Sequence, residues 1–126
     1  MTTTSKRPVF LNLWQIKLPV SGVVSIAHRL SGVVLILSLP VAVHLFERSL
    51  SGPQGFAEAA AVLSHPFTQL LLLLLTWSLL HHLFAGVRYL LVDFNLGLTI
   101  PAARKSAWIA LGGAVLVAPV VWGLLP

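Results

Sequence analysis

Three long stretches of hydrophobic residues, almost free of charge, restrict most strongly what this chain can fold into. They cover about 21–48, 66–94 and 106–125, and each contains the roughly 20 apolar residues that a helix needs to cross a bilayer. Charged residues make up 9% of the chain, whereas about a quarter of the residues in soluble domains are charged. The sequence therefore predicts an all-α membrane protein, a three-transmembrane-helix bundle that forms a single membrane domain over residues 1–126.

Two polar connectors separate the three predicted helices. The first connector, 49–65, contains Gly and Pro residues that mark a turn. Pro66 can then begin the second helix, because its fixed φ suits a first helical turn. The second connector, 95–105, contains Pro101, which we expect to act as a helix breaker. His65 lies directly before Pro66 and is expected to cap the second helix or to face water.

The positions of lysine and arginine predict the orientation in the membrane. Basic residues precede the first span and also lie between the second and third spans, whereas the first connector, counted with the two residues before it, has only Arg48 beside two glutamates. The basic residues of the first two groups are Lys6, Arg7, Lys17, Arg104 and Lys105. Because cytoplasmic loops carry an excess of positive charge, we expect a cytoplasmic N-terminus. With no signal-peptide core ahead of it, the first span would direct insertion into a bacterial inner (cytoplasmic) membrane as part of a multi-pass protein.

Several function classes are disfavoured by the composition. The formal net charge of +5 could suggest nucleic acid, but the basic residues neither gather on one face nor alternate with aromatic residues. The chain has no cysteine, which excludes disulfides, thiolate metal sites and thiol catalysis. It has three acidic residues and no Ser–His–Asp arrangement, phosphate loop or paired carboxylates, so hydrolytic acid–base chemistry is poorly supported.

A first polar cluster lies in the segment SIAHRLSG, residues 25–32, near the start of the first span. At about 100° per residue, Ser25, Arg29 and Gly32 share one helical face, with His28 at its edge. Ionisable groups inside spans are costly and usually serve a function. The alternative is that Arg29 extends to the lipid headgroups and His28 merely lies at the interface.

A second polar cluster lies in the second span. His82, Gly86, Tyr89 and Asp93 form one stripe, since their offsets return to within about 40° of the same direction on an α-helix. His82 lies about 16 Å along the helix axis from Asp93, deep in the bilayer if Asp93 marks the interface. The neighbouring His81 points roughly 100° away and is not expected to serve the same ligand.

A buried, neutral His82 has three possible roles. It can ligate haem iron, act in a proton relay, or form a hydrogen bond to a neighbouring helix. Gly86 favours the first role, because a flat macrocycle needs a cleared helix surface. The same stripe would also suit a proton-linked transporter, so the spacing leaves these alternatives open.

Taken together, the motifs resemble a known family. Arg7-Pro8, then SIAHRLSG (25–32), then HLFAGVRYLLVD (82–93) are similar to segments of the cytochrome b subunit of succinate dehydrogenase, the larger of the two membrane anchors of respiratory complex II. Two residues or stretches depart from its pattern. Tyr89 stands where a His is commonest, and FLNLWQIKLP (10–19) differs from the family's usual sequence there.

The resemblance implies specific site residues. His82 would be an axial ligand of haem b, and so the metal ligand for the haem iron, while the second anchor subunit supplies the other ligand. Ser25 and Arg29 would line the ubiquinone pocket, and His28 would lie near the haem propionates. No catalytic residue for succinate oxidation is implied in this chain.

The resemblance also implies partners and a role. The chain would pair with a second anchor subunit and dock the flavoprotein and iron–sulfur subunits of complex II. It would help to pass electrons from the iron–sulfur subunit to ubiquinone, linking the tricarboxylic acid cycle to the respiratory chain. The alternatives are a small proton-coupled membrane transporter subunit, a haem-free structural anchor, and an anchor of a fumarate reductase of related architecture.

Overall fold

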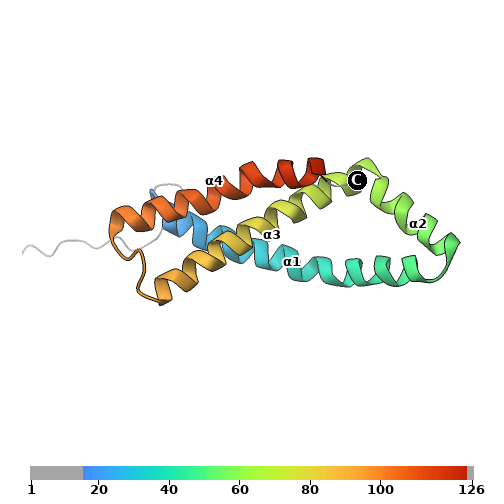
Figure 1. Cartoon of the computed structure of the whole chain (residues 1–126), viewed down its shortest axis with the longest axis horizontal. Coiled ribbons are helices and arrows are strands. Elements are labelled where there is room, and N and C mark those ends of the chain that lie inside the picture. Colours follow the sequence, from blue (N-terminus) through green and yellow to red (C-terminus); the bar gives the residue numbers. More distant parts are fainter. Residues whose placement is uncertain (1–15, 125–126) are drawn as a thin grey trace, which may run out of the picture.

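The computed structural model describes residues 16–124, which fold into helices joined by short turns. The elements are α1 (Val20–Leu50), α2 (Pro53–Ser64), α3 (Pro66–Asp93) and α4 (Ile100–Leu124) (Figure 1). Three of them, α1, α3 and α4, are long and apolar enough to cross a membrane. The predicted all-α fold with three candidate spans is therefore confirmed. The N-terminal residues Lys6, Arg7 and Pro8 and most of the stretch 10–19 lie outside the described residues.

The three long helices run alternately up and down. α1 and α4 begin at the end of the molecule where α3 finishes, and α2 lies at the opposite end, where it joins α1 to α3 (Figure 1). α3 is the central helix, since it packs against α4 and α1 more extensively than those two pack against each other. Side chains on different faces of α3 therefore contact α1 and α4.

The first connector is largely helical, which the sequence reasoning did not predict. Within 49–65, the segment Pro53–Ser64 forms α2. Pro53 begins this helix after Gly52, whose φ of 117° suits glycine alone. The alanine-rich stretch that follows has a high helix propensity. Gly55 packs directly on the backbone carbonyl of Arg48 in α1, so the absence of its side chain allows the tight α1–α2 hairpin.

The last helix begins earlier than the sequence suggested. α4 begins at Ile100 rather than at about 106, and the second connector shortens accordingly. Pro101 does not break a helix but lies in the first turn of α4, where the missing N–H has no intrahelical acceptor to lose. The next hydrogen bond, from the Ala103 N–H to the Thr99 carbonyl at 2.8 Å, closes that first turn.

Both ends of α3 are fixed by local hydrogen bonds. At the start, His65 Nδ1 accepts from the Phe67 N–H at 3.2 Å, so His65 is the predicted cap. At the end, Asn95 adopts a φ of 61°. The Leu96 N–H donates to the Leu91 carbonyl at 2.9 Å, and the Asn95 N–H donates to the Val92 carbonyl. This is the Schellman pattern that terminates many helices.

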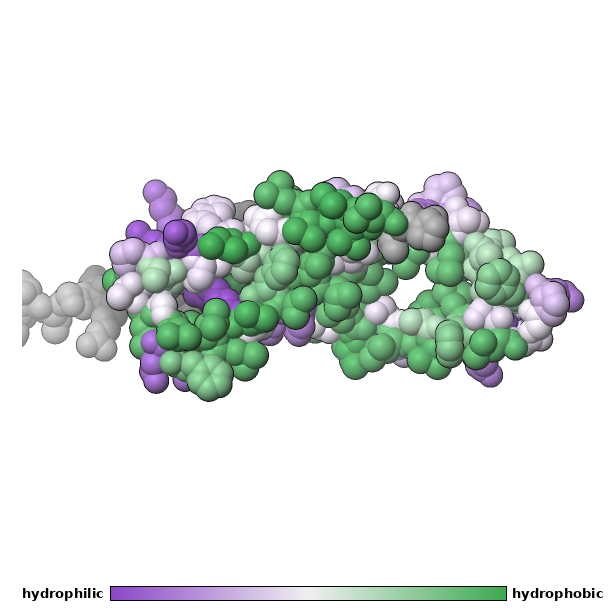
Figure 2. All heavy atoms as spheres, viewed as in Figure 1, coloured by the Kyte–Doolittle hydropathy of each residue, from purple (hydrophilic) through white to green (hydrophobic). Residues whose placement is uncertain are grey.

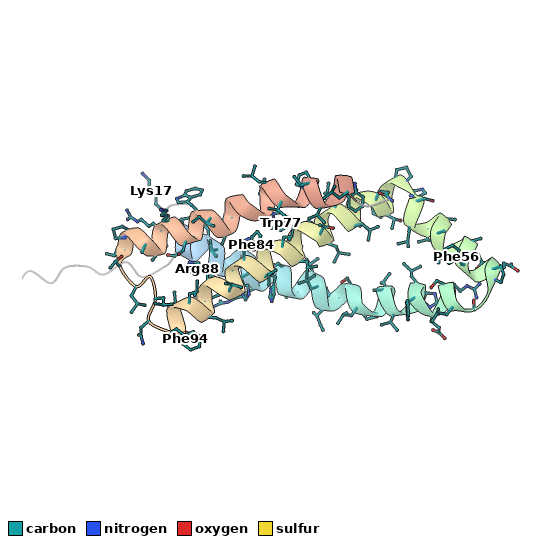
Figure 3. All side chains as sticks on the ribbon, in the orientation of Figure 1. Lys17, Phe56, Trp77, Phe84, Arg88 and Phe94 are labelled. Carbon is teal, nitrogen blue, oxygen red and sulfur yellow. The ribbon has the colours of Figure 1, made fainter. Side chains whose placement is uncertain are left out.

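Small residues form the contact between α3 and α4. The buried core contains Val24, Ala85, Ala107 and Ala110. Ala114 and Ala118 continue the same buried face of α4. A Cβ added at Gly113 would lie 3.2 Å from Phe84 Cε2, so the Phe84 ring packs over the bare backbone of α4. Figure 3 shows Phe84 and Arg88 on the stretch of α3 that lies beside α4.

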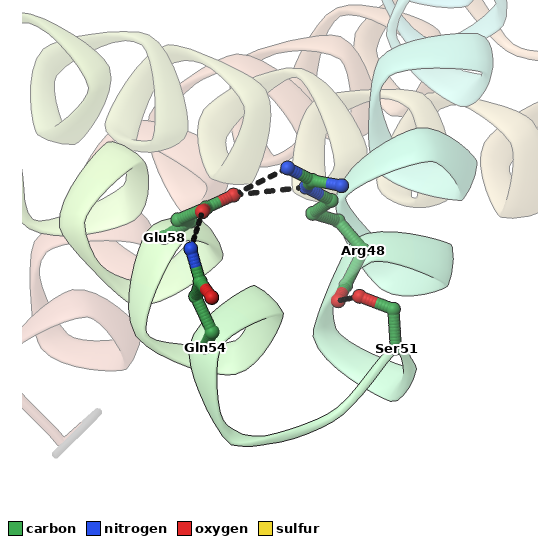
Figure 4. Close-up of polar contacts among 4 residues, drawn as sticks. All are labelled: Arg48, Ser51, Gln54 and Glu58. Carbon is green, nitrogen blue, oxygen red and sulfur yellow. Dashed lines mark hydrogen bonds and ion pairs between the residues drawn. The ribbon is translucent and has the colours of Figure 1, made fainter.

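α1 and α3 separate toward the α2 end. There they enclose, with α2, an apolar cavity of about 810 Å³ lined mainly by leucines, valines and alanines. Figure 2 shows the opening in this region. At the tip, Arg48 Nη2 and Nε donate to Glu58 Oε2 at 2.6 and 3.0 Å, and Gln54 Nε2 donates to Glu58 Oε1 at 3.2 Å (Figure 4).

Candidate functional site

His82 of α3 is held by a single turn of α1. Its Nδ1 lies 3.1 Å from the backbone carbonyl oxygen of His28 and 3.2 Å from Ser31 Oγ. The Ser31 hydroxyl in turn donates to the same His28 carbonyl at 2.8 Å. The three groups close a small triangle of polar contacts between two helices.

The triangle fixes the tautomer of His82. A carbonyl oxygen can only accept a hydrogen bond, so the 3.1 Å contact places the proton on Nδ1. The Ser31 oxygen can accept from the same N–H while its own hydrogen goes to the carbonyl. In the neutral ring the lone pair is then on Nε2. His82 therefore presents a metal-ligating nitrogen whose opposite nitrogen is already fixed, the arrangement typical of histidine ligands.

Gly32 makes this close approach possible. A Cβ at position 32 would lie 3.0 Å from His82 Cε1 and 3.5 Å from Nδ1. Any side chain there would press on the imidazole ring. Gly32, which helical geometry places on the same face as Ser25 and Arg29, therefore faces α3, and the His82 ring packs against it.

The His28 side chain covers the His82 ring. The two imidazoles stack with centroids 4.0 Å apart and an interplanar angle of 12°. Tyr89 meets His28 edge-on at 5.3 Å. A Cβ at Gly86 would lie 3.7 Å from His28 Nε2, so the cleared surface at Gly86 lies next to His28. The structure therefore brings together His28, His82 and Tyr89 from two helices.

Ser25 and Arg29 are not part of this contact. Ser25 is half-buried and Arg29 is exposed, and within residues 16–124 neither side chain forms a hydrogen bond. Arg29 follows His28 by about 100° around α1, and this turns the guanidinium away from α3. Ser25 and Arg29, the quinone pair expected from the sequence, thus lie on a face of α1 next to the face that carries His28.

His81 has surroundings quite different from those of His82. It is fully buried, and its ring stacks on Trp77 with centroids 5.4 Å apart. Both ring nitrogens lack hydrogen-bond partners within the described chain, as does the hydroxyl of Ser78 one turn earlier. The two adjacent histidines therefore face different neighbours, and of the two it is His82 that contacts Ser31 and the His28 carbonyl of α1.

Arg88 links α3 to α4. It is 8% exposed, and its Nε donates to Ser106 Oγ at 3.0 Å while Nη2 donates to the Ala103 carbonyl at 3.4 Å. Its guanidinium also lies 5.4 Å from the centroid of the Tyr89 ring. Sequence reasoning assigned no role to Arg88. Arg88 lies about 240° around the helix from His82. This offset could have indicated from the sequence that the two side chains face different helices.

The described part of the chain does not form a complete metal site by itself. Within residues 16–124, no group of three or more His, Asp or Glu side chains is placed to hold a metal ion. A site with His82 as its only ligand from this chain would suit a metal that a macrocycle already holds, because the protein then needs to supply only axial ligands.

Known proteins are similar in sequence to this chain along most of its length. The family model described as "Succinate dehydrogenase/Fumarate reductase transmembrane subunit" matches residues 3–121. The succinate dehydrogenase cytochrome b556 subunit of Coxiella burnetii is 34% identical over 105 residues, covering 82% of this chain and 84% of that protein. The subunit of the same name from Paracoccus denitrificans is 30% identical over 112 residues, covering 89% and 86%.

A more distant relative agrees with these two. The succinate dehydrogenase cytochrome b560 subunit of Reclinomonas americana is 29% identical over 121 residues, covering 92% of this chain and 84% of that protein. The match of the family model extends over all three long apolar helices. The chain therefore belongs to the succinate dehydrogenase/fumarate reductase transmembrane subunit family, as a cytochrome b membrane-anchor subunit of complex II.

Proposed function

We propose that this chain binds haem b through His82 and ubiquinone through Ser25 and Arg29, and helps to pass electrons from the iron–sulfur subunit to quinone. The observation that carries the proposal is the fixed His82 ring, whose Nδ1 lies 3.1 Å from the His28 carbonyl and whose Nε2 keeps its lone pair. Membership of the family favours this role over the transporter subunit that the sequence left open.

His82 Nε2 would ligate the haem iron, and a residue of the second anchor subunit would supply the other ligand. The haem, when bound, would supply a one-electron carrier. The residues of this chain hold the ligand: the His28 carbonyl and Ser31 fix the ring on one side, and the His28 imidazole stacks on its face. Gly32 leaves the space that this arrangement needs.

His28 has a second role in the proposal. Its ring stacks on His82 and lies beside the bare backbone of Gly86. An imidazole N–H there can donate to a carboxylate, which is the group that haem propionates present. Tyr89, whose ring meets His28 edge-on at 5.3 Å, would restrict the orientation of His28 rather than contact the propionate itself.

Ser25 and Arg29 would bind the quinone on the adjacent face of α1. Reducing a quinone to a quinol adds two electrons and two protons, and negative charge builds on the carbonyl oxygens before they are protonated. The Ser25 hydroxyl can donate to one oxygen, and the Arg29 guanidinium stabilises that negative charge. The effect grows when neighbouring subunits exclude water, because the local dielectric falls.

The end of the molecule that carries Lys17, Arg104 and Lys105 would face the cytoplasm. These residues are exposed, and α1 and α4 both begin at this end (Figure 1). Positive charge favours the cytoplasmic side of a membrane, here of the bacterial inner membrane. Ser25 and Arg29 lie near the same end, so the flavoprotein and iron–sulfur subunits, which would carry the succinate chemistry, would dock beside the quinone face.

A spectrum of the assembled complex tests the haem assignment. We expect a b-type band in the reduced-minus-oxidised spectrum of the wild-type complex, its loss in His82→Ala and its retention in His44→Ala, which removes an exposed histidine of α1. A wild-type complex without the band would support a haem-free structural anchor instead. An unchanged band in His82→Ala would remove His82 as the ligand.

The rate of quinone reduction tests the proposed binding of ubiquinone by Ser25 and Arg29. We expect Arg29→Ala to lower succinate:quinone reductase activity by roughly 100-fold, the effect of losing one charge-stabilising donor. Succinate oxidation with a soluble acceptor should survive, and Arg104→Ala should leave both activities unchanged. Equal loss of both activities in Arg29→Ala would indicate failed assembly and would contradict a specific role in quinone binding.

A further inference from the structure

We propose that Ser31 is a positioning residue for the iron ligand: its hydroxyl, acting with the His28 carbonyl, fixes the ring of His82 and increases electron donation from Nε2. This inference rests on the proposed function, because it assumes that His82 ligates haem iron. It adds a residue for which neither the sequence motifs nor the family match supplied a role.

The geometry gives the Nδ1–H of His82 two acceptors. Ser31 Oγ lies 3.2 Å from Nδ1 and the His28 carbonyl lies 3.1 Å from it. Ser31 is fully buried, so water cannot compete for these contacts. Since one hydroxyl donates once and accepts twice, Ser31 can donate to the carbonyl at 2.8 Å and accept from His82 simultaneously.

Ser38 shows that this arrangement is more than a common helical contact. It also lies on α1, and its hydroxyl donates to the Leu35 carbonyl at 2.7 Å, three residues earlier. Ser31 makes the equivalent bond to His28. What distinguishes Ser31 is the additional contact across the helix interface to His82. Ser38 therefore offers a matched control for the loss of a serine hydroxyl on this helix.

The chemical consequence follows from the ligand's second nitrogen. A hydrogen bond donated by Nδ1–H raises the basicity of Nε2, which strengthens ligation and stabilises the oxidised iron. Removing the Ser31 hydroxyl takes away one acceptor of this hydrogen bond and therefore lowers the basicity of Nε2. The haem should then become easier to reduce and easier to lose, while His82 itself is still present.

The test uses the assembled complex with Ser31→Ala, Ser31→Thr and Ser38→Ala. Redox titration gives the haem midpoint potential, electron paramagnetic resonance of the oxidised complex gives the ligand field, and a chase with a haem-binding protein gives haem retention. In S31A we expect a higher midpoint potential, an altered resonance signal and about tenfold weaker haem retention. S31T keeps the hydroxyl and should restore all three values, and S38A should match wild type.

Unchanged potential, resonance and retention in S31A would overturn the inference, as would an equal shift in S38A. If S31A does not assemble, Ser31→Cys replaces it, since its sulfur is a weak acceptor of similar size, and an unchanged potential there would again overturn the role. A wild-type complex without haem would instead overturn the proposed function. If haem is lost in His82→Ala but its potential, resonance signal and retention are unchanged in S31A, the positioning role of Ser31 is rejected and His82 remains the ligand.

Discussion

The two halves of this bundle are built in opposite ways. In the histidine half, defined here as residues 20–34 of α1 and 78–93 of α3 with the α4 residues beside them, the helices meet closely and bury polar side chains. In the open half, residues 35–50 of α1, α2 and 66–75 of α3, the helices separate around an apolar cavity of about 810 Å³. Both halves have similarly apolar sequences, so hydrophobicity alone does not decide which half packs.

The difference comes from side-chain size and polar pairing. Gly32, Ala85 and Ala110 let backbones approach in the histidine half, and the polar groups of His82 and Arg88 then find partners across the interface. The cavity of the open half is lined mostly by leucine, valine and phenylalanine side chains, and the ion pair of this half lies at the exposed tip. Because lipid is as apolar as leucine, helices in a membrane associate through close packing and hydrogen bonds rather than through hydrophobicity.

The largest expected effect comes from enlarging one alanine in each half. Ala110→Leu places a bulky side chain in the buried α3–α4 contact, where Ala110 is 2% exposed, and should destabilise the fold by about 1–3 kcal/mol or more through overpacking. Ala60→Leu, at the cavity wall, should change the stability little. Thermal unfolding of both variants in detergent measures the difference. Equal destabilisation would show that the open half is as closely packed as the histidine half.

A smaller difference should separate two arginines. Arg88→Met keeps the aliphatic stem but removes the buried hydrogen bonds to Ser106 and the Ala103 carbonyl, at an expected cost of about 1–2 kcal/mol. Arg48→Met removes an ion pair whose side chains are 53% and 43% exposed, which should cost less than about 1 kcal/mol. Denaturant unfolding in mixed micelles would compare the two. A larger loss of stability in Arg48→Met than in Arg88→Met would show that polar contacts stabilise the open half more than the histidine half.

Adding one methyl group at a glycine tests how closely the long helices pack at two positions. Gly32→Ala puts a Cβ 3.0 Å from His82 Cε1, so the ring must shift, and we expect a broadened haem spectrum and a loss of about 1 kcal/mol in stability. Gly112→Ala meets nothing within 4 Å and should be neutral or slightly stabilising, because alanine favours a helix. Absorption spectra and melting of the two complexes provide the check. An unchanged spectrum in Gly32→Ala would show that His82 has more room than the contact implies.

The smallest effect should come from the tip of the open half. Glu58→Gln removes the charge that faces Arg48 Nη2 and should lower stability by no more than about 0.5 kcal/mol, since exposed ion pairs contribute little. The loss should shrink further as salt screens the pair. Unfolding measured at low and high ionic strength would reveal a stronger structural role for this pair if the loss were large and independent of salt.

Much of the fold could be predicted because a transmembrane span is a local property. The spans at about 21–48, 66–94 and 106–125 correspond to α1, α3 and α4. α2 was missed because Gly52 and Pro53 indicate a turn, although the alanine-rich stretch after them favours a helix. The start of α4 was misplaced because Pro101 is a breaker inside a helix but is well suited to a first turn.

The candidate site was predictable only in part. The motifs singled out His28 and His82, and the structure stacks these two rings. Helical geometry also grouped Gly32 with Ser25 and Arg29, yet Gly32 faces His82 while Arg29 is exposed. Residues within about 60° of one another on a helix can still meet different neighbours, so a shared face did not define a shared site.

The sequence by itself determined that this chain forms three apolar helices, because in a bilayer each helix must satisfy its backbone hydrogen bonds internally. It also determined which residues are costly to bury there. Only the tertiary structure decided that Ser31 and the His28 carbonyl hold His82, that Arg88 binds α4, and that α1 and α3 separate at the α2 end. Those pairings depend on which helix surfaces meet, which is set by contacts between residues far apart in the chain.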